Sequence, residues 1–179
     1  MSEKKIPYRG LYEWMQTIVV TFLLVLFLLL FIGRNIGVEQ QSMTPTLLDG
    51  DRMIVRSILY TPSRGDIVIF AKQDFEEGTA MVKRVIGTAG DEIDIDTTSG
   101  IVYLNGAPLD EPFVNDLTFF AGDTIYPYIV PAGHVFVMGD NRNHSNDSRS
   151  TAIGSVDTRE IIGQAIAVFF PFDRIGLLR

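Results

Sequence analysis

Polar residues that turns do not explain gather in three segments of the sequence, residues 40–47, 81–87 and 139–149. The first contains Ser42, whose hydroxyl could act as a nucleophile, and the second contains Lys83 within an otherwise apolar run. A neutral lysine amine can take the proton of a serine hydroxyl, in the role that histidine has in a Ser–His–Asp triad. These residue types therefore allow acyl transfer by a Ser–Lys pair.

Two interpretations of Lys83 are open on the pattern alone. Lys83 and Arg84 are neighbours in a predicted strand, so they point to opposite faces and at least one of them faces inward. Either the tips of both side chains reach water, or Lys83 is buried and its pKa falls from about 10.4, because burial disfavours the ammonium ion. The second case makes Lys83 a usable base, but spacing alone does not show that it reaches Ser42.

Other kinds of site fit the sequence less well. A histidine triad would need His134, which begins a predicted strand, or His144, which lies in a polar loop, and no G-x-S-x-G motif is present. A calcium loop starting at Asp140 would place Arg142 and His144 where oxygen ligands are required. The chain has no cysteine and two histidines, which excludes thiolate chemistry and a His-rich metal site but does not by itself exclude calcium in the acidic loops. We expect a site that needs no metal or cofactor.

The residues that follow the N-terminal segment predict a mainly β fold of many short strands. Apolar and β-branched runs, several of them alternating with period two, are separated by Gly, Pro, Asp and Asn. Asn105-Gly106 predicts a tight hairpin, and one modest helix is predicted over residues 157–162. The predicted strands are 52–56, 66–71, 81–86, 92–95, 101–104, 125–130, 134–138 and 165–170.

The N-terminal segment predicts a single membrane-spanning helix. Residues 14–32 carry no charge, and as a helix they would reach about 28 Å, close to the thickness of a bilayer core. A cleaved signal peptide would have a shorter apolar run and an A-x-A site, and a buried core helix would be amphipathic. Basic residues precede the span, which favours a cytoplasmic N-terminus and a body outside the membrane. These basic residues are Lys4, Lys5 and Arg9.

The expected organisation has four parts along the chain. A cytoplasmic N-terminus, a transmembrane anchor, a short tether and an extracytoplasmic catalytic domain would occupy residues 1–13, 14–32, 33–41 and 42–179. The 179 residues contain 15 Lys and Arg against 22 Asp and Glu, a net charge of −7. Because phosphate binding needs basic patches, nucleic acid is not expected as a partner.

Five short motifs follow one another along the chain: S-M-x-P-T-L at 42–47, R-G-D-I-V at 64–68, K-R-V-I-G at 83–87 followed by Gly90-Asp91, G-D-N-R-x-x-S-x-D-S-R at 139–149, and R-I-G at 174–176. Taken together and in this order, they resemble the motifs of type I signal peptidases, the membrane-bound bacterial leader peptidase family, in its compact Gram-positive form. The resemblance covers nearly the full chain. One departure is Thr88-Ala89 in place of the commoner Leu-Pro, which we expect to alter a turn rather than the chemistry.

The resemblance implies a signal-peptidase-like β fold and a Ser–Lys mechanism. Ser42 would be the nucleophile and Lys83 the general base, and Ser145 would hydrogen-bond the lysine and orient it. The residues implied to brace the site are Asp140, Asp147 and Arg149, the last two as an ion pair.

The resemblance also bears on the oxyanion hole and on the substrate. The backbone N–H of Ser42 would be one oxyanion donor, and the side chain of Gln40, where relatives often have Ser or Gly, is the candidate second donor. The family binds its substrate as an extended strand whose small side chains fill shallow apolar pockets. Candidates for the lining, each with plain core packing as the alternative, are Val38, Met43, Leu47, Met81 and Val82.

The implied function is that of a membrane-anchored serine endopeptidase that removes signal peptides from exported preproteins. Its partners would be those signal peptides, the lipid bilayer of the cell membrane and the vicinity of the export machinery. Two alternatives are a related Ser–Lys peptidase dedicated to one specialised substrate and an inert, membrane-tethered β module that binds partners. The joint presence of Ser42, Lys83 and Ser145 argues against the inert module.

Overall fold

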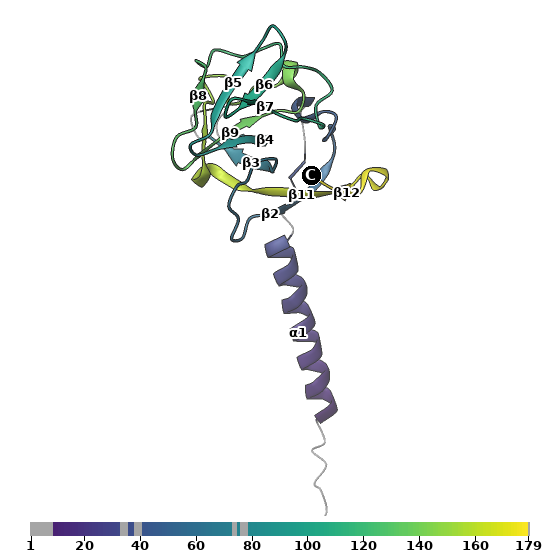
Figure 1. Ribbon diagram of the computed structural model, residues 1–179. Coiled ribbons are helices and arrows are strands. Elements are labelled where there is room, and N and C mark those ends of the chain that lie inside the picture. The colour runs from purple at the N-terminus through teal and green to yellow at the C-terminus, as the bar shows by residue number, and fades with distance from the viewer. Residues whose placement is uncertain (1–8, 33–35, 38–40, 73–74, 76–78, 179) are drawn as a thin grey trace, which may run out of the picture. The chain divides into compact units, whose positions relative to one another are not determined.

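The computed structural model of the protein describes residues 9–32, 36–37, 41–72, 75 and 79–178 (Figure 1). The chain divides into two compact units, Met1–Arg34 and Asn35–Arg179. The division falls within the segment that the sequence predicts as a tether.

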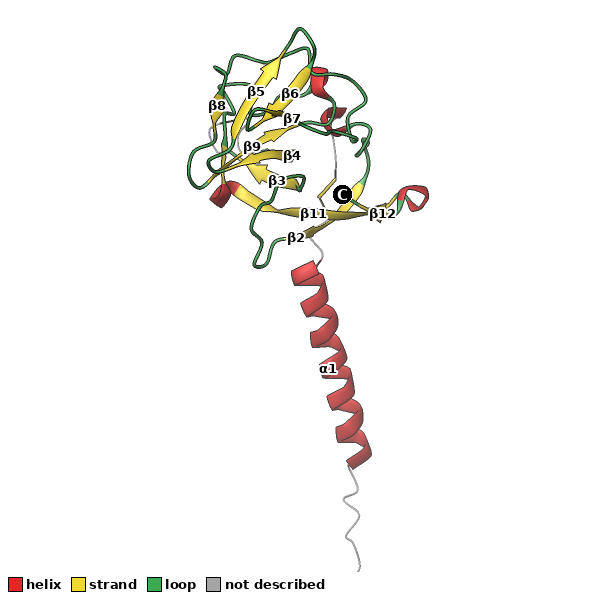
Figure 2. Ribbon diagram, viewed as in Figure 1, coloured by secondary structure: helices red, strands yellow, loops and turns green. Residues whose placement is uncertain are grey.

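The first unit contains one helix, α1 (Arg9–Ile32), of 24 residues (Figure 2). Its apolar side chains from Leu11 to Val25 are exposed, with Trp14 73% accessible. Across the described ranges, the structure has no helix whose length and apolar character suffice to cross a membrane.

The second unit is built from two antiparallel sheets, which confirms the prediction of a mainly β fold (Figure 2). The larger has eight strands in the order β1 (Ile36–Gly37), β2 (Arg52–Arg56), β11 (Ile161–Phe170), β3 (Ile67–Ala71), β4 (Ala80–Thr88), β9 (His134–Met138) and β10 (Val156–Asp157), with β12 (Gly176–Leu177) paired to β11. The smaller has the order β7 (Ala107–Pro108), β6 (Ile101–Leu104), β5 (Glu92–Asp96) and β8 (Tyr128–Ile129).

Strand β4 lies between β3 and β9 and is buried from Met81 to Gly87. It contributes to all three apolar clusters of the body: Val82 packs with Met43 and Leu47, Met81 and Val85 pack with the β9 valines, and Ile86 packs with the second sheet. A strand that is covered on both faces has a continuous apolar run, and the Met81–Ile86 part of β4 departs from this only at its two basic residues.

Several strands have the predicted bounds, namely β2, β6 and β9. The hairpin between β6 and β7 is also confirmed: Leu104 pairs with Ala107, and both intervening residues have positive φ, 53° for Asn105 and 77° for Gly106. This is the backbone conformation that a two-residue turn of type I′ requires.

The predicted helix over residues 157–162 is wrong. A single 3₁₀ turn, η4 (Thr158–Glu160), is closed by a capping box between Asp157 and Glu160, and the chain then enters β11. The β-branched Ile161 and Ile162 favour a strand. At Gly163 the backbone of β2 approaches so closely that a Cβ would lie 2.7 Å from the carbonyl oxygen of Arg56. Strand β8 is likewise shorter than the predicted 125–130.

Candidate active site

The structure brings Ser42 and Lys83 together although 41 residues separate them in sequence. Ser42 lies in the 3₁₀ turn η1 (Gln41–Met43), and Lys83 lies in the middle of β4. The Nζ atom of Lys83 is 2.8 Å from the Oγ atom of Ser42 and 3.1 Å from the carbonyl oxygen of Val82. The accessible fractions are 7% for Ser42 and 2% for Lys83, so the pair is largely removed from water.

Arg84, the neighbour of Lys83, is fully buried, so neither basic side chain of β4 extends its tip into water. Arg84 donates from Nε and Nη2 to the two carboxylate oxygens of Asp140, at 2.8 and 2.7 Å. It also donates to the carbonyl oxygen of Gly65 and lies over the ring of Phe113, 4.0 Å from its centroid. The charge beside Lys83 is therefore balanced by a buried carboxylate.

Asp140 also contacts the segment that follows the nucleophile. The hydroxyl of Thr46 donates to Asp140 Oδ2 at 2.5 Å. The Asp140 carboxylate thus joins Thr46, in the segment after Ser42, to Arg84, the neighbour of Lys83. This contact links the two elements that carry the Ser–Lys pair.

The loop after β9 holds the backbone of the nucleophile turn. The N–H of Asn141 donates to the carbonyl oxygen of Ser42 at 3.0 Å, and its side-chain amide donates to the carbonyl oxygen of Gln41 at 3.1 Å. At Gly139 a Cβ would overlap both the Ser42 carbonyl oxygen and the Ser145 side chain. Glycine therefore permits this close approach, and Ser145 lies at the same contact.

The partly exposed Ser145 forms one polar group with the buried Asp147 and Arg149. The hydroxyl of Ser145 donates to Asp147 Oδ2 at 2.7 Å, and the N–H of Gly139 donates to the same oxygen at 2.9 Å. Arg149 pairs with Asp147, with Nε 2.8 Å from Oδ1. This arrangement fixes the place of Ser145, whereas an orienting hydrogen bond between Ser145 and Lys83 stays a prediction.

A third buried ion pair was not singled out from the sequence. Arg142 donates from both terminal nitrogens to Glu111, and from Nε to the carbonyl oxygen of Gly139. Glu111 and Phe113 come from a loop outside the three polar segments, so no local pattern marked them. Within the described part of the chain, every buried side-chain nitrogen or oxygen has a hydrogen-bond partner.

The predicted substrate-binding residues differ in their surroundings. Met43 and Leu47 have no accessible surface and belong to an apolar cluster of the body, which favours core packing for both. Met81 and Val82 keep a small accessible fraction, 6% and 8%. Val38 and Gln40 lie outside the described residues.

The hydrogen bonds given for the described residues connect neither histidine to Ser42 or Lys83. His134 contacts the carbonyl oxygen of Ala132 through Nδ1 at 3.1 Å, and His144 ends the 3₁₀ turn η3 (Arg142–His144). A buried serine that shares a hydrogen bond with a buried lysine is instead the arrangement of a serine hydrolase with a lysine base. The fold and the candidate site fit the class of serine hydrolases, and the role of Lys83 as the base stays a prediction.

The family model and the sequence relatives agree with a serine hydrolase. The family model described as signal peptidase, peptidase S26, matches residues 11–170. A probable signal peptidase I-1 from Synechocystis sp. is 36% identical over 96% of this chain and 89% of its own length. A signal peptidase I from Bacillus licheniformis is 36% identical over 98% of both chains. The crystal structure of a signal peptidase I from Enterococcus faecalis is 28% identical, with a TM-score of 0.49 over 59% of this chain and 97% of that chain.

The chain belongs to the signal peptidase family, peptidase S26.

Proposed function

We propose that the protein cleaves signal peptides from exported preproteins, with Ser42 as nucleophile and Lys83 as general base. The observation that carries the proposal is the 2.8 Å contact between Lys83 Nζ and Ser42 Oγ, buried inside a chain of the signal peptidase family. A base must lie within hydrogen-bond reach of the proton that it removes, and this pair meets that condition.

The proposed reaction has two steps. Ser42 Oγ attacks the scissile carbonyl while the neutral Lys83 amine takes the hydroxyl proton and passes it to the leaving amine, so that an ester forms and the peptide bond breaks. Water then attacks the ester, Lys83 takes one of its protons and passes it to Ser42 Oγ, and the signal peptide leaves as a carboxylic acid that loses its remaining proton to the solvent. The oxyanion of each step would accept hydrogen bonds from the Ser42 N–H and from Gln40.

The surrounding polar residues would act through this pair. Asp140, joined to Thr46 and Arg84, would keep the nucleophile turn against β4. Ser145 would orient Lys83, and the Asp147–Arg149 pair would hold Ser145 in place. None of them needs to exchange a proton with the substrate.

The N-terminal unit would anchor the enzyme in the cell membrane. Apolar side chains are exposed along α1, and Lys4, Lys5 and Arg9 at its start favour a cytoplasmic N-terminus. In this proposal residues 1–13 are cytoplasmic, residues 14–32 span the bilayer, residues 33–41 form a tether and residues 42–179 are extracytoplasmic. The catalytic body would then work near the membrane surface, in the vicinity of the export machinery.

The test is cleavage of a preprotein with an A-x-A site by the detergent-solubilised full chain, followed by sequencing of the new N-terminus. We expect cleavage directly after the A-x-A site by the natural chain, and none by Ser42→Ala or Lys83→Ala. The double variant should be no worse than either single one, because the two residues act as a unit. Substantial activity in a folded single variant would contradict the dyad.

A panel of unrelated preproteins separates the general enzyme from a peptidase dedicated to one substrate. Cleavage of most members supports general processing, whereas cleavage of one alone supports the dedicated peptidase. Absence of any cleavage would favour the inert binding module.

A further inference from the structure

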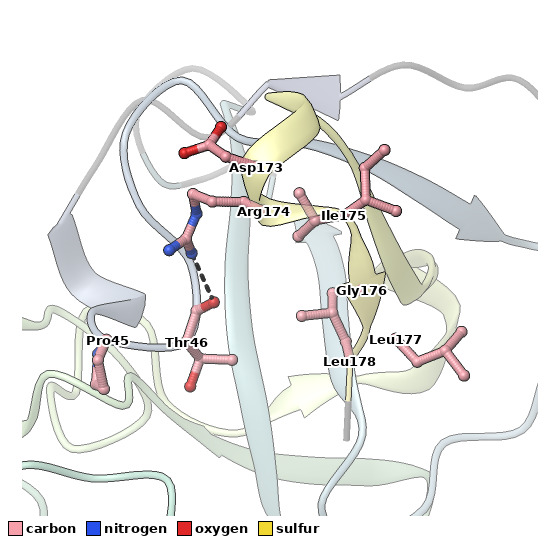
Figure 3. Close-up of a pocket in the computed structure, with 9 residues that line it drawn as sticks. Pro45, Thr46, Asp173, Arg174, Ile175, Gly176, Leu177 and Leu178 are labelled. Carbon is pink, nitrogen blue, oxygen red and sulfur yellow. Dashed lines mark hydrogen bonds between the residues drawn. The ribbon is translucent and has the colours of Figure 1, made fainter.

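The segment after the nucleophile, residues 44–51, is held from two sides. From one side Asp140 accepts the Thr46 hydroxyl, as described above. From the other side comes Arg174, at the end of the 3₁₀ turn η5 (Phe172–Arg174) near the C-terminus of the chain. Its Nη2 lies 3.3 Å from the carbonyl oxygen of Thr46 (Figure 3). Thr46 therefore connects Arg174 to the site through its own backbone and hydroxyl.

Arg174 also pairs with Asp51, the residue that closes this segment. Nε lies 2.9 Å from Asp51 Oδ1, and Nη2 lies 3.0 Å from Oδ2. Asp51 is 1% accessible, and its Oδ2 also accepts the N–H of Leu48 at 2.9 Å. Because the carboxylate is buried and shapes the turn from Leu48 to Asp51, the guanidinium that neutralises it supports the whole segment.

The contacts continue from Arg174 to the strand of the base. Arg174 contacts Thr46, Thr46 contacts Asp140, and Asp140 pairs with Arg84, the neighbour of Lys83. Each of the three links is a hydrogen bond of a charged group, which is the stronger kind. A shift of the segment at the Arg174 end would thus alter how Ser42 sits relative to Lys83.

Side-chain packing fills little of the space beside Arg174. A pocket of about 500 Å³ lies between the segment after the nucleophile and the C-terminal residues (Figure 3). Removal of the guanidinium would therefore enlarge an existing opening instead of allowing neighbours to close over it. The pocket is lined by Pro45, Thr46, Val168 and residues 173–178.

We propose that Arg174 is a positioning residue for Ser42: from the C-terminal end of the chain it fixes the segment after the nucleophile at the distance from Lys83 that proton transfer needs. The inference rests on the proposed function, since it assumes that Ser42 is the nucleophile. It predicts a loss in the chemical step with little change in substrate binding.

The test compares Arg174→Gln and Arg174→Lys with the natural full chain in detergent. Arg159→Gln is the matched control, because Arg159 forms the same kind of pair with Asp157 in the same body but its side chain is 88% accessible. Two readouts are measured at a temperature where circular dichroism shows each variant folded: kcat and KM for an A-x-A preprotein, and the rate at which a small fluorophosphonate labels Ser42. The small reagent reports the reactivity of the serine without needing the substrate site.

We expect Arg174→Gln to lower kcat and the labelling rate by about 10- to 100-fold with KM within about twofold, as a misplacement of about 1 Å would. Arg174→Lys, which keeps the charge but not the planar fork, should recover part of this loss, and Arg159→Gln should match the natural chain. If folded Arg174→Gln has natural kcat and labelling, the proposal is overturned. It is also overturned if the whole loss lies in KM, or if the Lys and Gln variants are equally impaired.

One further variant distinguishes a failure of the inference on Arg174 from a failure of the proposed function. Ser42→Ala is assayed in the same series. An inactive Ser42→Ala beside a fully active Arg174→Gln overturns the inference alone. An active Ser42→Ala overturns the proposed function and the inference with it.

Discussion

At the scale of single residues, three ion pairs among the described residues lie around the site. Arg84 pairs with Asp140, Arg142 with Glu111, and Arg149 with Asp147. Removing one partner from such a pair leaves an uncompensated charge, which costs about 3–5 kcal/mol. The described arrangement of the loop is therefore sensitive to the loss of either partner of a pair.

The sequence indicated only part of this arrangement. Residue type and pattern indicate Ser42 and Lys83 as separate candidates, but only the motif resemblance pairs them, since no periodicity relates residues that meet across a fold. The partner of Arg84 could not be predicted from β4, because Asp140 reaches it from the adjacent strand's end. Glu111 lies in a loop whose position depends on the packing of the second sheet.

Gly139→Ala tests the close approach at the site. A Cβ at this position would overlap the Ser42 carbonyl oxygen and Ser145, so we expect kcat/KM to fall at least about tenfold as the nucleophile turn shifts. Gly176→Ala is the control, because its nearest neighbouring atom would lie 3.9 Å away. Equal activity of the two folded variants in the preprotein assay would contradict the described contact.

At the scale of elements, local sequence patterns predict the positions of strands where apolar residues alternate with polar ones or form a continuous segment between two turns. The same local signals failed at η4, where a helix-like cap is followed by a strand. Pairing of β11 with both β2 and β3 decides the conformation there. Local preference is weak enough for such tertiary pairing to override it.

The corner between β4 and β5 gives a prediction on stability. Asp91 accepts the N–H and hydroxyl of Thr88 at 2.7 and 3.0 Å and the side-chain amide of Asn105 at 2.9 Å. Thr88 thus stabilises the turn between β4 and β5. Although burial acts to raise the pKa of Asp91, the hydrogen bonds from Asn105 and Thr88 outweigh it and hold this pKa below 3.8.

We expect Asp91→Asn to lower the free energy of unfolding in urea by about 1–3 kcal/mol at pH 7. Because the folded-state pKa is depressed, the charged form's contribution is fully present well above pH 3.8 and is lost as the pH falls through the folded value. The difference between the natural chain and the variant should therefore shrink on acidification. A difference that grows as the pH falls would show that the assigned direction is wrong. Activity of the folded variant at pH 7 should be unchanged.

At the scale of the whole molecule, the order of the strands is the part that sequence patterns did not predict. Strand β11 enters the sheet between β2 and β3, which precede it by about a hundred residues. Such an order depends on long-range pairing, and periodicity within one strand contains no information about its neighbours. The division of the chain into a helical unit and a β body was visible in composition alone.

The proposed topology is tested in intact cells from which the wall has been removed. Added protease should digest residues 33–179 while a cytoplasmic marker stays intact, because the basic residues precede the apolar segment. Replacing all three with Gln should raise the protected fraction by weakening this bias; the residues are Lys4, Lys5 and Arg9. A body that stays protected until the membrane is opened would contradict the topology.

The central claim, that Lys83 is the base for Ser42, is tested most directly by the pH dependence of kcat/KM. A neutral amine is required, and burial of Lys83 disfavours its charged form, so kcat/KM should rise with pH through an apparent pKa well below 10.4. This rise is the acidic limb of the pH profile, and its apparent pKa reports the ionisation of the Ser42–Lys83 pair rather than of either residue alone. It should stay in place when His134 and His144 are both replaced by Ala. A limb that moves or vanishes in the double-histidine variant would contradict the account, because a histidine would then be the base.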